Sequence, residues 1–352
     1  MRLLRAMLPA FGLLLLGYLI GRLGPGAIWH SLIDLRWRFA LVLAIACGWH
    51  ISNTIAWACA FPPDAFRPRL RHLFMAKLAG EAVSQVTPLA NLGGEPLKAY
   101  LLRGESPTSR GLASVVINKM AQVITGVLFT SVGLALVVFQ WPLPQDIPIT
   151  VQTGLWALLG CALLLLLFVW RQQGQLFSSL LRVLCHLGLR PEDLEQRQAR
   201  ASRIDRSIAG FYQRHWLRFG LVMFFHAIGW LLGAVETLVI LEGLGADVTF
   251  TVAFLVTALS VIINGVFFLM PSNIGVMEGG QVFLLTTLGL DPAMGLAMGI
   301  VKRMRKVFWI TVGWLFLHRL GHTALTASTA AEAAAAYPAV QTREAPPAAG
   351  QR

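Results

Sequence analysis

Long apolar stretches recur along this chain, and they constrain its fold more than any other feature. Seven of them approach or exceed the ~20 residues that cross a bilayer as a helix. They cover residues 8 to 23, 39 to 60, 112 to 140, 150 to 170, 216 to 242, 249 to 270 and 293 to 320. With 56% hydrophobic and 13% charged residues, the chain is too apolar for a soluble protein of this length. We therefore predict an all-α, polytopic integral membrane protein with about seven to nine membrane elements.

Two further segments, 73 to 102 and 276 to 290, are apolar but interrupted, and their breaks resemble each other. In each, a proline is followed seven residues later by a glutamate, Pro88 by Glu95 and Pro271 by Glu278. An asparagine and glycine lie between them, namely Asn91, Gly93 and Gly94 in the first break and Asn273 and Gly275 in the second. Because lipid offers no hydrogen-bond partners, such backbone must be buried in protein or line a polar cavity.

Matched breaks in two halves of a membrane chain indicate a binding site at the interface of two repeats. We therefore predict two broken or re-entrant helices and an internal repeat. The first repeat covers about 8 to 140 and the second about 216 to 320, within a membrane domain of residues 1 to 322. The Ala- and Pro-rich segment from 323 to 352 has no apolar periodicity, so it is predicted to be disordered.

The first break carries ionisable groups that are expensive to place in hydrocarbon. Lys77 and Glu81 are four residues apart and share a helix face. Glu95 precedes Pro96, a pattern typical of a helix N-terminus, which attracts anions when cations such as Lys98 and Arg103 lie nearby. The sequence thus predicts a site for a lipid phosphate. The alternative is that Glu95 only caps its helix and that the lysines remain at the membrane surface.

The second break and the last apolar stretch supply a matching set. Glu278 falls in the first turn of a helix, and four cations follow inside residues 293 to 320, namely Lys302, Arg303, Arg305 and Lys306. We expect one pair, Arg303 with Lys306 or Lys302 with Arg305, to face a cavity while the other pair turns elsewhere. Alternatively, the cluster is a membrane boundary and the last helix begins at Val307.

Other spans also contain ionisable groups. Glu81, Lys119 and Glu236 are candidates for coupling transport to protons, with a structural ion pair as the alternative. Glu236 has two candidate partners, Lys119 and the 302 to 306 cluster. On the same helix, His226 and Trp230 lie on nearly the same face as Gly233.

The formal net charge of +12 fits membrane topology better than nucleic-acid binding, because the chain has no nucleic-acid module. The loop from 171 to 218 is rich in arginine and is therefore predicted to be cytoplasmic, together with the N-terminus. No motif indicates a catalytic residue, a metal site or a cofactor.

These motifs resemble the lysylphosphatidylglycerol synthase transmembrane region, a family of flippase-like membrane proteins, over most of residues 8 to 320. The similar stretches are Pro88-Leu-Ala-Asn-Leu-Gly-Gly-Glu95-Pro-Leu-Lys98, Pro271-Ser-Asn-Ile-Gly275-Val-Met-Glu278 and Lys302-Arg303-Met-Arg305. Residues 93 to 103 and 302 to 309 look most like the branch associated with hopanoid biosynthesis loci. Lys98 stands where arginine is common and Asn273 where glycine is common, which leaves the headgroup preference open.

The resemblance implies transfer of a polar lipid between the leaflets of a bacterial inner membrane. The expected partners are anionic membrane lipids and proteins of lipid biosynthesis. Family members that make aminoacylated lipids carry a further soluble catalytic domain, so no aminoacylation is expected of this chain. Two alternatives remain open: a membrane enzyme that acts on lipid or polyprenyl phosphate headgroups, and a scaffold of a lipid or envelope assembly.

Overall fold

A computed structural model describes residue 35 and residues 37 to 62, 68 to 86, 93 to 103, 108 to 139, 208 to 267 and 275 to 336, with a few single positions between 156 and 206. At 108 to 109, 137 to 139 and 321 to 336, only the backbone is described. Regular structure in these ranges is entirely helical, which confirms the predicted fold class. The expected spans at 8 to 23 and 150 to 170 lie outside the described residues, apart from single helical positions in the latter.

Eight helices of the described ranges position the site. They are α3 (Arg38–Cys59), α4 (Leu70–Val86), α5 (Glu95–Leu101), α6 (Thr108–Phe139), α10 (Trp216–Gly243), α11 (Phe250–Val266), α12 (Val276–Thr287) and α13 (Pro292–Ala336). Three described segments are long and apolar enough to cross a bilayer, at 38 to 59, 110 to 136 and 216 to 243. These observed bounds agree with the apolar stretches to within a few residues.

The first break separates α4 from α5, which pack against each other as an antiparallel pair. Two glycines allow this approach, because a Cβ on Gly94 would lie 1.8 Å from the carbonyl oxygen of Gly80. The Gly94 N–H donates to the Ser84 hydroxyl at 2.9 Å. Ser84 therefore binds the backbone of Gly94 just before α5, and no side chain caps α5 among the described residues.

The second break separates α11 from α12, and α12 packs antiparallel against α13. Gly275 has a φ of 77°, a left-handed conformation that glycine adopts without steric cost. Gly295 and Gly299 let α13 approach α12, since a Cβ on Gly295 would lie 2.7 Å from the Cα of Val282. Both breaks thus place a short helix against a longer neighbour.

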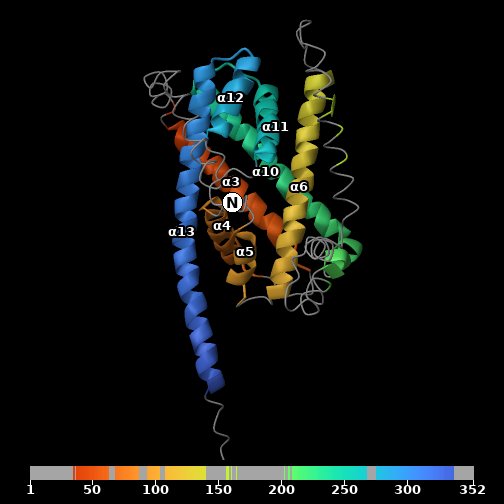
Figure 1. The fold of residues 1–352 in the computed structure, drawn as a ribbon, viewed down its shortest axis with the longest axis vertical. Helices are drawn as coiled ribbons and strands as arrows, with labels where there is room; N and C mark the ends of the chain where they lie inside the picture. Colours follow the sequence, from red (N-terminus) through yellow and green to blue (C-terminus); the bar gives the residue numbers. More distant parts are fainter. Residues whose placement is uncertain are drawn as a thin grey trace, which may run out of the picture.

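Helices of the first half of the chain pack against helices of the second half. α4 of the first half packs against α13 of the second, while α11 packs against α6, and α3 runs along α10. Figure 1 shows α4 and α5 between α13 and α6. The order of elements follows the predicted repeat, with a short helix before a long one in each half.

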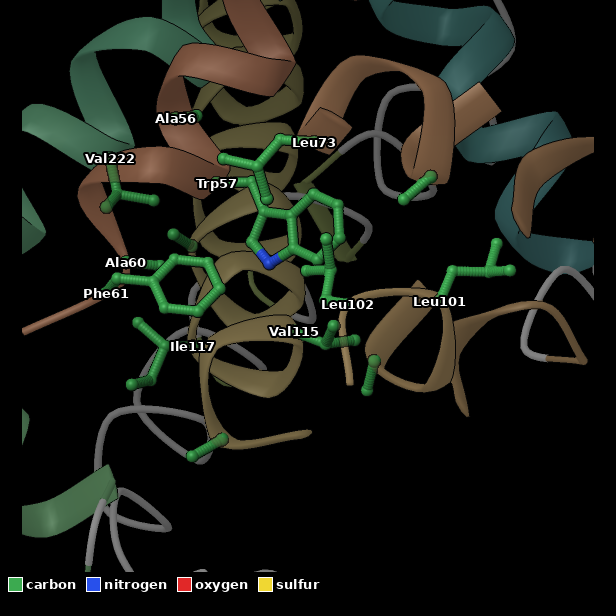
Figure 2. Close-up of a cluster of buried hydrophobic side chains, with 14 of the residues drawn as sticks. Ala56, Trp57, Ala60, Phe61, Leu73, Leu101, Leu102, Val115, Ile117 and Val222 are labelled. Atoms are coloured by element: carbon green, nitrogen blue, oxygen red, sulfur yellow. The ribbon is translucent and has the colours of Figure 1, made fainter. Parts of the chain in front are cut away.

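The two larger of three buried apolar clusters in the described residues connect most of the helices. One surrounds Trp57, whose ring lies near Leu73 and Leu102 (Figure 2) and whose Nε1–H donates to the Ser114 hydroxyl at 3.1 Å. This cluster joins α3 and α4 to α5, α6 and the start of α10. The other joins the opposite end of α3 to α10, α11, α12 and α13.

Two expectations for the C-terminal part of the chain differ from the structure. α13 is one continuous helix from Pro292, so no helix begins at Val307. Its backbone remains helical to Ala336, whereas disorder was expected from residue 323. Alanine has the highest intrinsic helix propensity. The prediction from composition gave the alanines of this segment too little weight.

Candidate functional site

A cavity of about 1070 Å³ lies among the helices, and all eight contribute to its lining. Its wall combines aromatic and aliphatic groups, such as Trp49 and Trp230, with a dense set of polar and charged side chains. The volume is at the upper end of the ~300–1,000 Å³ found for ligand sites. The interrupted helices therefore border a cavity whose wall carries charged and polar side chains among apolar ones, in line with the prediction from the breaks.

Positive charge exceeds negative charge in this cavity. Seven cationic side chains line it with four carboxylates, which leaves an excess of three positive charges among the described residues. The cations are Lys77, Lys98, Lys119, Lys302, Arg303, Arg305 and Lys306, and the carboxylates are Glu81, Glu95, Glu236 and Glu278. Buried charges are costly unless paired, so the pattern of pairing decides which cations can meet a ligand.

The first half of the chain contributes two ion pairs. Lys77 Nζ lies 2.7 Å from a Glu81 carboxylate oxygen, which confirms the shared helix face. The same ammonium lies 3.0 Å from His50 Nδ1 and 4.7 Å from the centre of a Trp49 ring. His50 thus adds a third titratable group to this pair, and sequence reasoning did not select it because it is a single histidine in an apolar span.

The second pair of this half joins α5 to α6. Lys98 Nζ lies 3.0 Å from a Glu95 carboxylate oxygen, and Lys119 Nζ lies 3.7 Å from the same oxygen. Lys119 also donates to Gln122 Oε1 at 3.1 Å. Glu95 therefore serves two lysines, so its single negative charge leaves one positive charge of this group uncompensated.

In the second half, Glu278 is fully bonded. One carboxylate oxygen accepts from Arg303, including a 2.7 Å bond from Nε, and the other accepts the Gly275 N–H at 2.8 Å. Its side chain is only 2% exposed. Glu278 thus caps α12 and holds α13, so the N-terminus of α12 is occupied by its own carboxylate rather than free for a phosphate.

The remaining cations lie on α13 beside α10. Arg305 Nη1 bonds a Glu236 carboxylate oxygen at 2.5 Å, and Lys302 Nζ donates to the Thr237 hydroxyl at 2.9 Å. Among the described residues, neither Lys302 nor Lys306 has a carboxylate within 4 Å. Both side chains line the cavity. Lys302 and Lys306 are therefore the cations best placed to meet an anion.

One expectation about this cluster was wrong. We expected either Arg303 with Lys306 or Lys302 with Arg305 to face the cavity, but all four side chains line it. The reason is that α13 contacts both α10 and α12 there. Long side chains on two sides of the helix can therefore reach the same space.

A histidine joins three helices at the centre of the cavity wall. His226 Nδ1 lies 2.6 Å from Asn53 Oδ1, and its Nε2 lies 2.9 Å from Asn118 Oδ1. Since Asn53 Nδ2 donates to the Trp49 carbonyl at 2.8 Å, Nδ1–H of His226 is the donor to Asn53. His226, Trp230 and Gly233 all line the cavity, which confirms their predicted common face.

Replacing His226 with leucine is expected to lower the free energy of unfolding by about 2 kcal/mol, because the Asn53 oxygen stays buried without a donor. The loss would appear as a lower thermal midpoint of the purified protein in detergent. Phe224→Leu, on an exposed position of the same helix, is the control and should change the midpoint little. Equal midpoints for wild type and His226→Leu would contradict a joining role.

The predicted site residues divide into three groups. Glu95, Lys98, Glu278, Arg303 and Lys306 line the cavity, as do the three coupling candidates Glu81, Lys119 and Glu236. Gly93, Gly94, Gly275 and Arg103 do not line it; the glycines shape the breaks, and the Arg103 guanidinium lies 4.3 Å from the centre of the Tyr100 ring. Asn91 and Asn273 lie outside the described residues.

The sequence similarities of the chain agree with this architecture. Residues 6–313 match the family model described as the lysylphosphatidylglycerol synthase TM region. The chain belongs to this family. A UPF0104 membrane protein of Methanothermobacter thermautotrophicus is 24% identical over 320 residues, which cover 87% of this chain and 91% of that relative. No solved structure matches the chain.

Membership in the lysylphosphatidylglycerol synthase TM region family confirms the resemblance that the two breaks and the basic cluster carried. With its apolar helices, the family assignment makes this a multi-pass membrane protein. All three stretches behind the resemblance fall within the matched residues. The narrower assignment to the branch associated with hopanoid loci stays a prediction.

Proposed function

We propose that this protein transports a lipid with a phosphate-bearing headgroup between the two leaflets of the bacterial inner membrane. The headgroup would enter the cavity while the acyl chains stay in the bilayer. The lipid would be a phospholipid or an isoprenoid or hopanoid-type lipid. Its transfer would need no catalytic residue, metal or cofactor of this chain.

The observation that carries this proposal is the excess of three positive charges in the cavity. Each of the four carboxylates has a cationic partner, so the surplus falls on Lys119, Lys302 and Lys306. Charges inside a membrane domain are costly, and like charges add repulsion to that cost. An anionic group in the cavity would lower both the cost of burying these charges and the repulsion between them.

The arrangement of the breaks supports movement around such a site. α4 of the first half packs against α13, and α11 of the second half packs against α6. The helix before each break therefore contacts the other half of the chain. We propose that one half opens against the other, as in transporters built from two repeats. Glu81, Lys119 and Glu236 remain the proposed coupling groups, and the loop from 171 to 218 would lie in the cytoplasm beside anionic lipids.

Replacing Lys302 and Lys306 together with glutamine is expected to slow transfer of an anionic lipid about tenfold or more, because each buried cation that meets phosphate contributes roughly 1.5–3 kcal/mol. The measurement is transbilayer movement of fluorescent lipids in liposomes that contain purified protein. Neither lysine has a carboxylate within 4 Å in the described ranges, so folding should be retained.

Arg71→Gln, an exposed cation of α4 outside the cavity, is the matched control and should move lipid at the wild-type rate. No movement of any anionic lipid by wild type, with or without an imposed ion gradient, would contradict the proposal. Metal-dependent conversion of a lipid by the purified protein would instead support an enzyme.

A further inference from the structure

Two pairs of an arginine and a carboxylate line the cavity, and they differ in how completely they are bonded. In the Glu278 pair, Arg303 and the Gly275 N–H use both carboxylate oxygens. In the Glu236 pair, only Oε2 is used, by Arg305 Nη1. The other oxygen, Glu236 Oε1, and Arg305 Nε are buried and have no hydrogen-bond partner in the described part of the chain.

Further unused polar groups line the same cavity. Gln281 Oε1 and Trp309 Nε1 are also buried without a partner among the described residues. Glu236 and Gln281 are 2% and 1% exposed, and both line the cavity. Buried polar atoms are nearly always bonded in proteins, so a group of unbonded ones at a cavity indicates atoms that a ligand would supply.

The two unused donors, Arg305 Nε and Trp309 Nε1, share one face of α13 with two lysines. Lys302, Arg305, Lys306 and Trp309 have the spacing i, i+3, i+4 and i+7, which places their side chains in one row. At 1.5 Å per residue the row is about 10 Å long, longer than a single phosphate. The unused acceptors, Glu236 Oε1 and Gln281 Oε1, belong to α10 and α12, which both contact α13.

We propose that these groups recognise a headgroup in which a phosphate is joined to a hydrogen-bond donor, a hydroxyl or an ammonium. The phosphate oxygens accept from Arg305 Nε and Lys306 Nζ, and the donor group bonds to Glu236 Oε1 or Gln281 Oε1. This inference rests on the proposed function and names its substrate class. A phosphate with only an alkyl substituent leaves the buried acceptors unbonded and is rejected.

The test is binding to purified full-length protein in detergent by isothermal titration calorimetry. Dihexanoylphosphatidylglycerol and dihexanoylphosphatidylmethanol have the same charge but differ in their hydroxyl groups. We expect the glycerol headgroup to bind roughly tenfold more tightly or better. Equal affinities for the two lipids would overturn the inference.

Glycerol 3-phosphate and methyl phosphate repeat the comparison without acyl chains, which separates a lipid from a soluble ligand. Tighter binding of the lipid pair than of the soluble pair, with the glycerol form preferred, supports a lipid headgroup. Glycerol 3-phosphate that binds as tightly as phosphatidylglycerol, with the same preference, supports the headgroup chemistry and assigns it to a soluble ligand.

Two variants test the named acceptors. Gln281→Leu and Glu236→Leu should each weaken the preference for phosphatidylglycerol, and the two changes together should reduce it to nearly one, because leucine offers no acceptor. Thr287→Val, on an exposed position of α12, should keep the wild-type preference. Thermal midpoints show which variants are folded, and retention of the full preference in the folded double variant would overturn the inference.

Binding and transport can fail separately. Selective binding without lipid movement in liposomes would contradict the proposed transport and leave the headgroup recognition standing. Lipid movement with equal affinity for both headgroups would do the opposite.

Discussion

Replacing Arg303 with alanine is expected to abolish lipid movement and to lower the free energy of unfolding by about 3–5 kcal/mol. The reason is that the Glu278 side chain, 2% exposed, would remain inside the protein without its cation. α12 and α13 would then lose the charged bond that joins them beside the cavity. The measurements are thermal denaturation in detergent and transbilayer movement in liposomes.

A double variant separates the two effects. Arg303→Ala combined with Glu278→Gln removes the unpaired charge, and the amide oxygen can still accept the Gly275 N–H. We therefore expect the double variant to be more stable than Arg303→Ala alone but equally inactive. If the two variants were equally unstable, the buried charge would not be the cause of the instability.

Replacing Gly94 with alanine is the second change with a large expected effect. The new Cβ would lie 1.8 Å from the Gly80 carbonyl oxygen and 2.6 Å from the Gly80 carbonyl carbon, distances that no non-bonded pair of heavy atoms can keep. Because both atoms belong to backbone, α5 must move away from α4, and Glu95 and Lys98 move with it. We expect a loss of about 3 kcal/mol or more, seen as poor recovery of folded protein and a lower thermal midpoint.

The effect at Gly94 is steric, since its φ of -89° is one that alanine adopts without strain. Gly220→Ala on α10 is the matched control, because a Cβ there has no atom within 4 Å. That change should leave stability unchanged or raise it by up to ~1 kcal/mol, as alanine favours helix more than glycine. A Gly94→Ala protein as stable as the Gly220→Ala protein would show that α4 and α5 do not require this approach.

The sequence by itself determined the helices, the two breaks and the local pairs. Apolar runs of bilayer length predict α3, α6 and α10, because the hydropathy of a segment depends only on the residues of that segment. Glycine and proline mark the breaks through their own backbone preferences. The Lys77–Glu81 pair follows from a spacing of four residues, which any helix converts into a contact.

The tertiary structure alone decided which charged side chains on different helices form pairs. Glu236 had two candidate partners, and it pairs with Arg305, 69 residues away. His226 bonds Asn53, which is 173 residues away in the sequence, and the Ser84 hydroxyl of α4 accepts the Gly94 N–H. Such contacts depend on how separate helices pack, and no spacing along the chain encodes that geometry. The cations of the sequence therefore indicated a surplus of positive charge. Only the packing of the helices shows that this surplus lies at Lys302 and Lys306.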